Sequence, residues 1–257
     1  MRILFLDILT DDPRLRAIAE QDIMKMSYSE LFRKGFGHAD DLWTVVDASR
    51  DVLPSLLSFD ALVISGSMEN AIKDQEKPWM HRTYDFIRDV IQANIPVFGV
   101  CGGLQFTVRS LGGEVIRNTS GRNFGLSHTK LTDDGKKDPL LSTYEDSAQV
   151  FVSHSYRAAD LPTNCQLLSQ SEKCPFDAIG YGSHVRLLQF HPEFNAEIIA
   201  GLAELHKETL VKEGHASESG FADYVARTRQ LQGTGHRLLG SVVPFFELVR
   251  AASSSST

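Results

Sequence analysis

A cysteine among glycines is the first residue in this sequence that could do chemistry. An apolar run leads to Cys101, and Gly99, Gly102 and Gly103 surround it. The pattern predicts a strand, a sharp turn and a helix, with the thiol as the nucleophile of the turn, because side chains on its neighbours would clash there. The positive end of the following helix favours the reactive thiolate. The alternative is a buried structural cysteine.

A candidate base lies much later in the chain, where the apolar run 187–190 ends in His191, Pro192 and Glu193. A catalytic thiol needs an imidazole to take and return protons, and the imidazole needs a carboxylate to fix its tautomer. Pro192 keeps His191 out of the helical conformation, and residues i and i+2 of an extended chain point to one side. Alone, these residues would indicate a surface turn. With Cys101, they predict a Cys101–His191–Glu193 triad.

The composition narrows the class of protein. The chain has 257 residues, of which 42% are apolar and 23% charged, with a net charge of −7. This acidic balance, without a basic cluster, argues against nucleic-acid binding. The apolar run 3–9 is too short for a signal peptide or a membrane span. Three cysteines, Cys101, Cys165 and Cys174, lack the spacing of a zinc site. The sequence therefore predicts a reduced, cytoplasmic protein that contacts no membrane and holds no metal.

Strands alternate with helices along most of the chain, which predicts an α/β fold with a doubly wound, mostly parallel sheet flanked by helices. Ligands of such sheets bind at the carboxyl ends of the strands, which places Cys101, His191 and the loop after Ser65 at one edge. Residues 133–139 are predicted to form a solvated turn. The predicted strands cover 2–8, 42–46, 60–65, 96–100, 114–116, 127–131, 149–153, 178–181 and 185–190, and the predicted helices cover 79–93, 102–111, 195–212, 214–235 and 236–250.

We expect a single domain over residues 1–212, a C-terminal helical extension over 213–252 packed on it, and a disordered tail over 253–257. The sequence shows no linker and no internal repeat.

Several stretches of the chain, which together span roughly residues 2–210, resemble class I (triad) glutamine amidotransferases. The stand-alone branch of γ-glutamyl peptidases and GMP-synthase-type amidotransferase homologues is the most similar. Its likeness includes residues 43–47 and 65–71 and the long C-terminal extension. The stretches that carry the family resemblance are 99–105, 191–193, 63–67, 111–115, 123–125 and 152–154.

The resemblance implies a flavodoxin-like fold and cysteine-dependent hydrolysis of the glutamine side-chain amide through a γ-glutamyl thioester. The products would be glutamate and ammonia, with the ammonia passing to an acceptor on another chain, a separate synthetase subunit. No cofactor is needed. The resemblance also places the oxyanion-hole N–H groups at Gly102 and Ser67, and puts Gln105, His154 and Ser155 near the head group of the substrate.

Two departures from the family leave other functions open. The position after the nucleophile is often bulky in that family but is Gly102 here, and Ser155, Tyr156 and Arg157 stand where an acidic residue is often found. One alternative is a γ-glutamyl peptide hydrolase acting on γ-glutamyl conjugates. Another is a non-catalytic regulatory subunit. His154 is a rival base, but it lacks a carboxylate two residues later, so we interpret it as a pocket or structural histidine.

Overall fold

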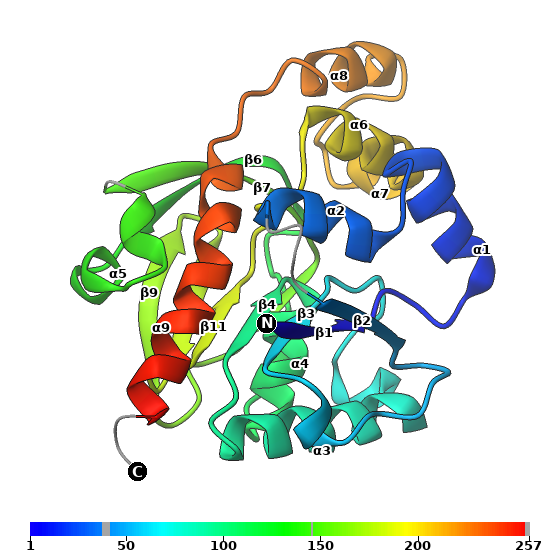
Figure 1. Ribbon diagram of the computed structural model, residues 1–257. Helices are drawn as coiled ribbons and strands as arrows, with labels where there is room; N and C mark the ends of the chain where they lie inside the picture. The colour runs from blue at the N-terminus through cyan, green and yellow to red at the C-terminus, as the bar shows by residue number, and fades with distance from the viewer. Residues whose placement is uncertain (38–41, 145, 255–257) are drawn as a thin grey trace.

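A mixed sheet of mostly parallel strands runs through the centre of the molecule (Figure 1). The computed structural model describes residues 1–37, 42–144 and 146–254. Over these residues the nine-stranded sheet has the order β2-β1-β3-β4-β11-β10-β9-β6-β7, and β5 and β8 form a separate two-stranded sheet. The strands are β1 (Arg2–Asp7), β2 (Leu42–Asp47), β3 (Ala61–Ile64), β4 (Val97–Val100), β5 (Val115–Arg117), β6 (Asn123–Leu131), β7 (Ser147–His154), β8 (Tyr156–Ala158), β9 (Cys165–Ser171), β10 (Cys174–Tyr181) and β11 (Val185–Leu188).

The sheet has two halves of different character. Strands β2, β1, β3, β4 and β11 pair in parallel, and β10, β9, β6 and β7 continue from β11 in antiparallel pairs. The parallel strands β3, β4 and β11 are buried along their whole length, as expected for strands covered on both faces. Their carboxyl ends lead to the loop after Ser65, to Cys101 and toward His191, so the predicted site residues share one edge.

Helices cover both faces of the parallel half. The helices are α1 (Pro13–Ala17), the π-helical turn η1 (Ile18–Ile23), α2 (Tyr28–Phe36), α3 (Pro78–Gln92), α4 (Gly102–Ser110), α5 (Asp133–Lys137), α6 (Ala196–Leu205), α7 (Lys207–Lys212), α8 (Phe221–Thr228) and α9 (Val242–Ser254), with short 3₁₀ turns η2 (Leu56–Ser58), η3 (Lys73–Gln75), η4 (Leu141–Thr143) and η5 (Gly235–Ser241).

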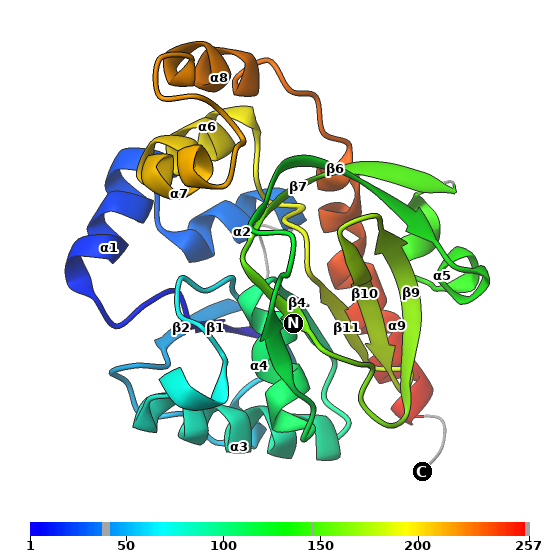
Figure 2. The ribbon, with the colours of Figure 1, turned by 180° about the vertical axis from the view of Figure 1, so that it is seen from behind.

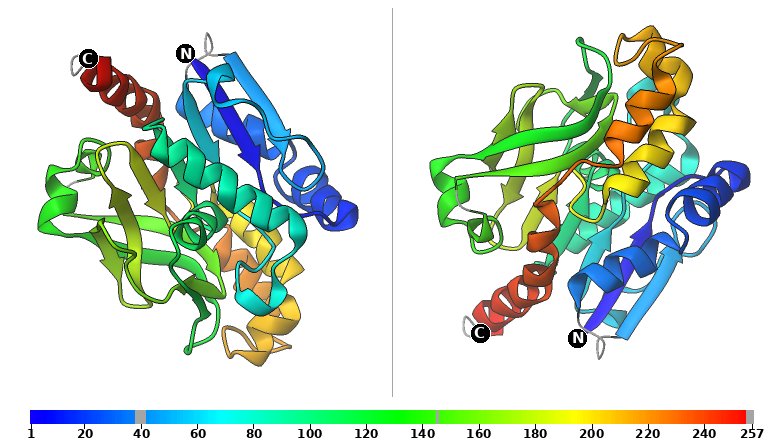
Figure 3. Two further views of the ribbon diagram at one scale, coloured as in Figure 1. Left: turned by 90° about the horizontal axis from the view of Figure 1, so that it is seen from below. Right: turned by 90° about the horizontal axis from the view of Figure 1, so that it is seen from above.

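Alternation along the strands creates two cores. Ile3 and Phe5 point to the face covered by α2, α6 and α9, whereas Leu4 and Leu6 point to the face covered by α3 and α4, as the period of two along a strand requires. Figure 2 shows α4 in front of the parallel strands and the antiparallel strands β9 and β10 beside it. In the view from above (Figure 3, right), α6, α7 and α8 gather on one side and α9 on the other.

The structure corrects several sequence-based expectations. The predicted turn at 133–139 is wrong, since it contains helix α5, capped by Thr132, and Asp138 is buried against Arg186. Strand β9 was not predicted. The predicted helix 195–212 is divided at His206 into α6 and α7. The predicted helix 214–235 shrinks to α8.

The C-terminal region also differs from expectation at its end. The helix α9 continues to Ser254, so the beginning of the predicted disordered tail is helical, and residues 255–257 of that tail lie outside the described residues.

Within the described part of the chain, no helix combines the length and the apolar character needed to cross a membrane.

Candidate active site

Cys101 occupies the sharp turn between β4 and α4. Its backbone has φ +50° and ψ −99°, a conformation that an L-residue adopts only at a cost of order 1–3 kcal/mol. Its amide N–H donates to the carbonyl of Leu188 on the neighbouring strand, and the residue is 5% exposed. Gly103 has no room for a side chain, since a Cβ there would lie 2.8 Å from the carbonyl oxygen of Ile64. The neighbouring strands therefore hold the strained turn in place.

His191 and Glu193 lie side by side at the end of β11. The Nδ1 of His191 is 2.7 Å from the Oε1 of Glu193, as their i, i+2 spacing predicted. The phenol of Tyr28, from α2, donates to the same carboxylate oxygen at 2.7 Å. The ring of Phe194 stacks on the imidazole with 3.9 Å between centroids and 3° between planes. Carboxylate, phenol and aromatic ring thus fix the orientation of the imidazole.

The electrostatic surroundings of His191 favour its charged form. The ring is 4% exposed, and burial alone would lower its pKa. The carboxylate of Glu193 and the thiolate of Cys101 outweigh this effect and raise the pKa of His191 well above its usual value. An imidazolium beside a thiolate is the charge state that a cysteine nucleophile uses. Cys101 and His191 line one cavity and Glu193 bonds to His191, and the role of the three residues as a triad stays a prediction.

The two predicted oxyanion-hole residues lie against each other. A Cβ built on Gly102 would be 2.4 Å from the Cβ and 2.6 Å from the backbone nitrogen of Ser67. The Ser67 hydroxyl donates to the carbonyl of Ile8 at 2.6 Å, which fixes the loop after β3. The departure from the family at Gly102 thus has a physical reason in this chain, because any side chain would push the Ser67 amide away from the helix start.

Gln105 and Ser155, both predicted near the substrate head group, lie in the cavity beside Cys101. The amide of Gln105 donates to the carbonyl of Tyr156 at 2.9 Å and to the side-chain oxygen of Gln189 at 3.3 Å. The amide of Gln189 in turn lies 3.5 Å from the sulfur of Cys101. A chain of amides therefore connects the thiol with the segment around Ser155. Sequence reasoning missed Gln189, although it precedes the predicted base by two residues.

His154 also lines the cavity, in surroundings that keep it neutral. Its Nδ1 is 3.0 Å from the carbonyl of Tyr156 and its Nε2 is 3.3 Å from the amide nitrogen of Asn123. A carbonyl only accepts, so the Nδ1 carries the proton and the Nε2 accepts from Asn123. Burial lowers the pKa of His154 to about 3. These contacts support the interpretation of His154 as a pocket histidine.

A cavity of about 450 Å³ opens around these residues. One end is polar and basic and contains Arg122, Ser153, Ser155 and His206. The wall next to His191 is apolar. Its side chains come from the loop after β1, from α1, from η1 and the residue that follows it, from α6, and from the segment between His191 and α6. They are Leu9, Leu15, Ala19, Ile23, Met24, Phe194, Ile198, Leu202 and Leu205. No local pattern predicts this wall, because its residues meet only in the folded chain.

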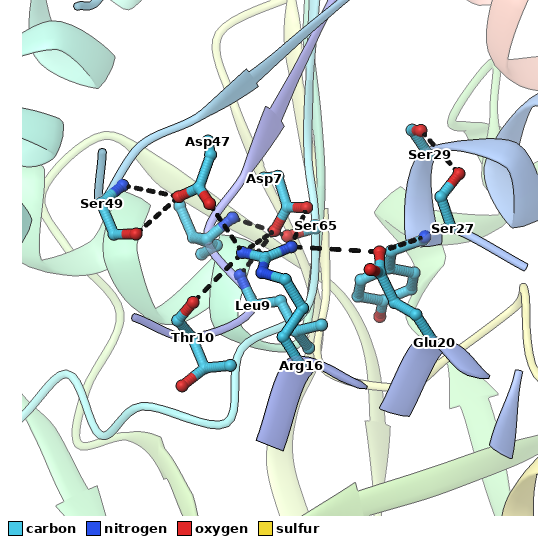
Figure 4. Close-up of polar contacts among 12 residues, drawn as sticks. Asp7, Leu9, Thr10, Arg16, Glu20, Ser27, Ser29, Asp47, Ser49 and Ser65 are labelled. Atoms are coloured by element: carbon cyan, nitrogen blue, oxygen red, sulfur yellow. Dashed lines mark hydrogen bonds and ion pairs between the residues drawn. The ribbon is translucent and has the colours of Figure 1, made fainter. Parts of the chain in front are cut away.

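An ion-pair cluster holds α1 and η1 to the edge of the sheet (Figure 4). The guanidinium of Arg16 bonds to Asp7, at the end of β1, at 2.6 Å, and to Asp47, at the end of β2, at 3.2 Å. Glu20 approaches it at 3.9 Å, and the carbonyl of Thr10 accepts a further bond. Since Leu15 directly precedes Arg16 and Ala19 follows three residues later, this cluster positions that part of the apolar wall.

No group of three or more histidine, cysteine or acidic side chains suited to a metal ion occurs in residues 1–37, 42–144 and 146–254.

Comparison with known proteins places the chain in a family. The family described as glutamine amidotransferase class-I matches residues 24–199. γ-Glutamyl peptidase 5 of Arabidopsis thaliana is 30% identical over 177 residues, which are 67% of this chain and 70% of that protein. The glutamine-hydrolysing GMP synthase of Vibrio atlanticus is 28% identical over 70% of this chain, but over 34% of its own length. The crystal structure of a glutamine amidotransferase from Thermotoga maritima shares the fold, with a TM-score of 0.70 at 22% identity over 96% of this chain and 98% of that one. This chain belongs to the class I glutamine amidotransferase family.

Proposed function

We propose that this protein hydrolyses the γ-amide bond of γ-glutamyl compounds through a thioester on Cys101. The observation that carries the proposal is the strained turn at Cys101, with the hydrogen-bonded pair of His191 and Glu193 at the end of the adjacent strand. A thiolate, a charged imidazole and a carboxylate in this order are the parts of a cysteine acyl-transfer site.

The residues support the following sequence of steps. The Cys101 thiolate attacks the γ-carbonyl carbon, and negative charge develops on the carbonyl oxygen. The backbone N–H groups of Gly102 and Ser67 stabilise that oxygen, each worth about 10²–10³ in rate in comparable sites. The His191 imidazolium gives its proton to the nitrogen, the C–N bond breaks and the amine leaves. His191 then takes a proton from water, which attacks the thioester carbon, so that the C–S bond breaks and glutamate departs.

The cavity favours a leaving group larger than ammonia. Because His191 protonates the leaving nitrogen, the leaving group has to lie beside its ring. The wall there is apolar, with Phe194 stacked on the imidazole and Ile198 and Leu202 following on α6. An amine that carries an apolar group would bury surface against this wall, at about 25 cal/mol per Å². The similarity to a protein named γ-glutamyl peptidase, over most of its length, supports the same choice.

The second candidate is hydrolysis of glutamine itself, with ammonia passed to a synthetase on another chain. The similarity to part of GMP synthase supports it, and the chemistry at Cys101 would be the same. In this reaction the leaving group is ammonia, which would bury no apolar surface against the wall.

The test measures glutamate release from L-glutamine and from γ-glutamyl amides of a small and a large apolar amine, such as methylamine and phenethylamine. The expected result is release that increases with the size of the amine and is lost in Cys101→Ala. Cys174→Ala, which changes a buried thiol far along the sequence from the turn, is the matched control. Release from glutamine alone would favour the amidotransferase. No release from any substrate, with Cys101 alkylating like an ordinary thiol, would favour the non-catalytic regulatory subunit.

A further inference from the structure

We infer that Arg122 binds the α-carboxylate of the γ-glutamyl group and makes that carboxylate a requirement for turnover. Arg122 precedes β6 and lines the cavity together with Ser153, Ser155 and His206. The inference rests on the proposed function, because it assigns the part of the substrate that stays on the enzyme as the thioester.

The guanidinium of Arg122 bonds only to neutral acceptors. Its partners are the hydroxyl of Ser155 at 3.1 Å, the hydroxyl of Ser153 at 3.0 Å, the Nε2 of His206 at 2.9 Å and, more weakly, the carbonyl of Ser153 at 3.5 Å. These bonds use three of the five guanidinium N–H groups. The Nε is enclosed and has no hydrogen-bond partner among the described residues. The group therefore retains donors for an anionic ligand.

The charge of Arg122 is also poorly compensated. Among the described residues, no carboxylate forms an ion pair with its guanidinium; Glu213, the nearby acid, accepts instead from the backbone N–H of Arg122 at 2.6 Å. Burial lowers the pKa of Arg122 to about 10, although Cys101 and Glu213 act to raise it. A partly desolvated cation without a counterion is costly in a fold, and a bound carboxylate would remove that cost.

Arg16 is a partly buried arginine with a structural role, and its surroundings differ from those of Arg122. Arg16 is surrounded by Asp7, Asp47 and Glu20, and these carboxylates raise its pKa in spite of burial. Arg122 has serine hydroxyls and a histidine in the equivalent roles. His206 is held neutral, since burial and the charge of Arg122 lower its pKa to about 3. The surroundings of Arg122 thus orient its guanidinium without neutralising it, as expected of a residue that binds an anion.

Arg122 and Cys101 line the same cavity, and the charge of Cys101 acts on the pKa of Arg122. Ser155, which bonds to Arg122, belongs to the segment that the family resemblance places near the head group, and the amides of Gln105 and Gln189 connect this segment with Cys101. Four carbon–carbon bonds separate the γ-carbonyl carbon from the α-carboxyl carbon, a reach of about 5 Å. A bond between a guanidinium and a carboxylate is stronger than a bond to a neutral acceptor, because both groups are charged.

The experiment compares three p-nitroanilides: L-γ-glutamyl, glutaryl, which lacks the α-amino group, and 4-aminobutanoyl, which lacks the α-carboxylate. The wild-type enzyme is expected to prefer the two carboxylate-bearing substrates over the third by about 10²-fold in kcat/KM. In Arg122→Gln this preference should disappear, mainly through KM, while turnover of the 4-aminobutanoyl substrate changes less than about threefold. Arg122→Lys should retain part of the preference, because it keeps the positive charge, and should lose the rest, because it lacks the planar guanidinium.

Arg82→Gln is the control for the loss of one positive charge, since Arg82 is exposed on α3, and it should keep the wild-type preference. Equal losses on all three substrates in both Arg122 variants would assign Arg122 a structural role and overturn the inference. If the wild-type protein hydrolyses none of them, the proposed function fails, and calorimetric titration of glutarate decides the inference. Binding of glutarate by wild type but not by Arg122→Gln would support it, and equal or absent binding would overturn it.

Discussion

His191 and His154 are both buried and both line the same cavity, yet their surroundings drive them to opposite charge states. They are 4% and 3% exposed, and burial acts on each to lower its pKa. His191 has a carboxylate on its Nδ1, and its pKa rises. His154 has a carbonyl and an amide, and its pKa falls to about 3. The partners, rather than the depth of burial, decide which histidine can carry a proton.

The largest expected effect is the loss of the histidine that has the carboxylate. His191→Gln removes the group that protonates the leaving amine and activates water, so kcat/KM for a γ-glutamyl anilide should fall by at least about 10⁴. His154→Gln is the matched control, and its kcat/KM should fall less than about tenfold, because a histidine with a pKa of about 3 is a weak base and its Nε2 is already bonded to Asn123. Comparable losses in the two variants would mean that the difference in partners does not separate their roles.

Removing only the carboxylate should lower the catalytic contribution of His191 and shift the pH dependence of kcat/KM. Glu193→Gln keeps the size of the side chain, but without the negative charge the pKa of His191 moves down. The alkaline limb of kcat/KM, where the imidazolium loses its proton, should therefore shift to lower pH, and kcat should fall by about 10².

Tyr28→Phe, which removes one hydrogen bond to the same carboxylate, should lower kcat by no more than about tenfold.

An alkaline limb of kcat/KM that stays in place in Glu193→Gln would show that another group sets the protonation of His191.

The sequence predicted the parallel half of the sheet and the elements around Cys101 because local signals define them. The apolar runs of β3 and β4 and the glycines of the turn determine strand, turn and helix without reference to the rest of the chain. The helix α5 was not predicted because its charged residues indicate a loop. The N-cap at Thr132 alone is a weak signal for a helix, and the ion pair that holds the end of this segment, between Asp138 and Arg186, forms only in the folded chain. Strand β9 has a mixed burial pattern and lacks clear alternation.

The same limit applies to the candidate site. Cys101, His191 and Glu193 could be predicted because their spacing and flanking residues are local patterns, and their catalytic roles stay a prediction. Tyr28 and Arg122 could not be predicted. Tyr28 reaches Glu193 across 165 positions of sequence, and the lack of a counterion at Arg122 is a property of its folded surroundings.

The smallest expected change in activity comes from giving His154 the kind of partner that His191 has. Asn123→Asp places a carboxylate oxygen where the amide nitrogen now lies, 3.3 Å from the Nε2 of His154. The lone pair on the Nε2 of neutral His154 would then face a negatively charged carboxylate oxygen. The ring should therefore bind a proton more readily, and the pKa of His154 should rise from about 3. The pH titration of the ring by ¹⁵N NMR measures this rise directly, and kcat should change less than about threefold.

The free energy of unfolding should report the same change as a weaker dependence on pH. In the wild type, the unfolded chain holds a proton on His154 up to its usual pKa of about 6.5 while the folded chain does not, so this group makes stability rise with pH up to that value. In Asn123→Asp the folded chain keeps this proton to higher pH, so the rise of stability with pH up to about 6.5 should become smaller by about 1–3 kcal/mol. Urea unfolding at several pH values measures the slope, with Asn123→Ser as the uncharged control. A pKa of His154 that stays near 3 in Asn123→Asp would mean that burial, and not the partner, sets the charge of both histidines.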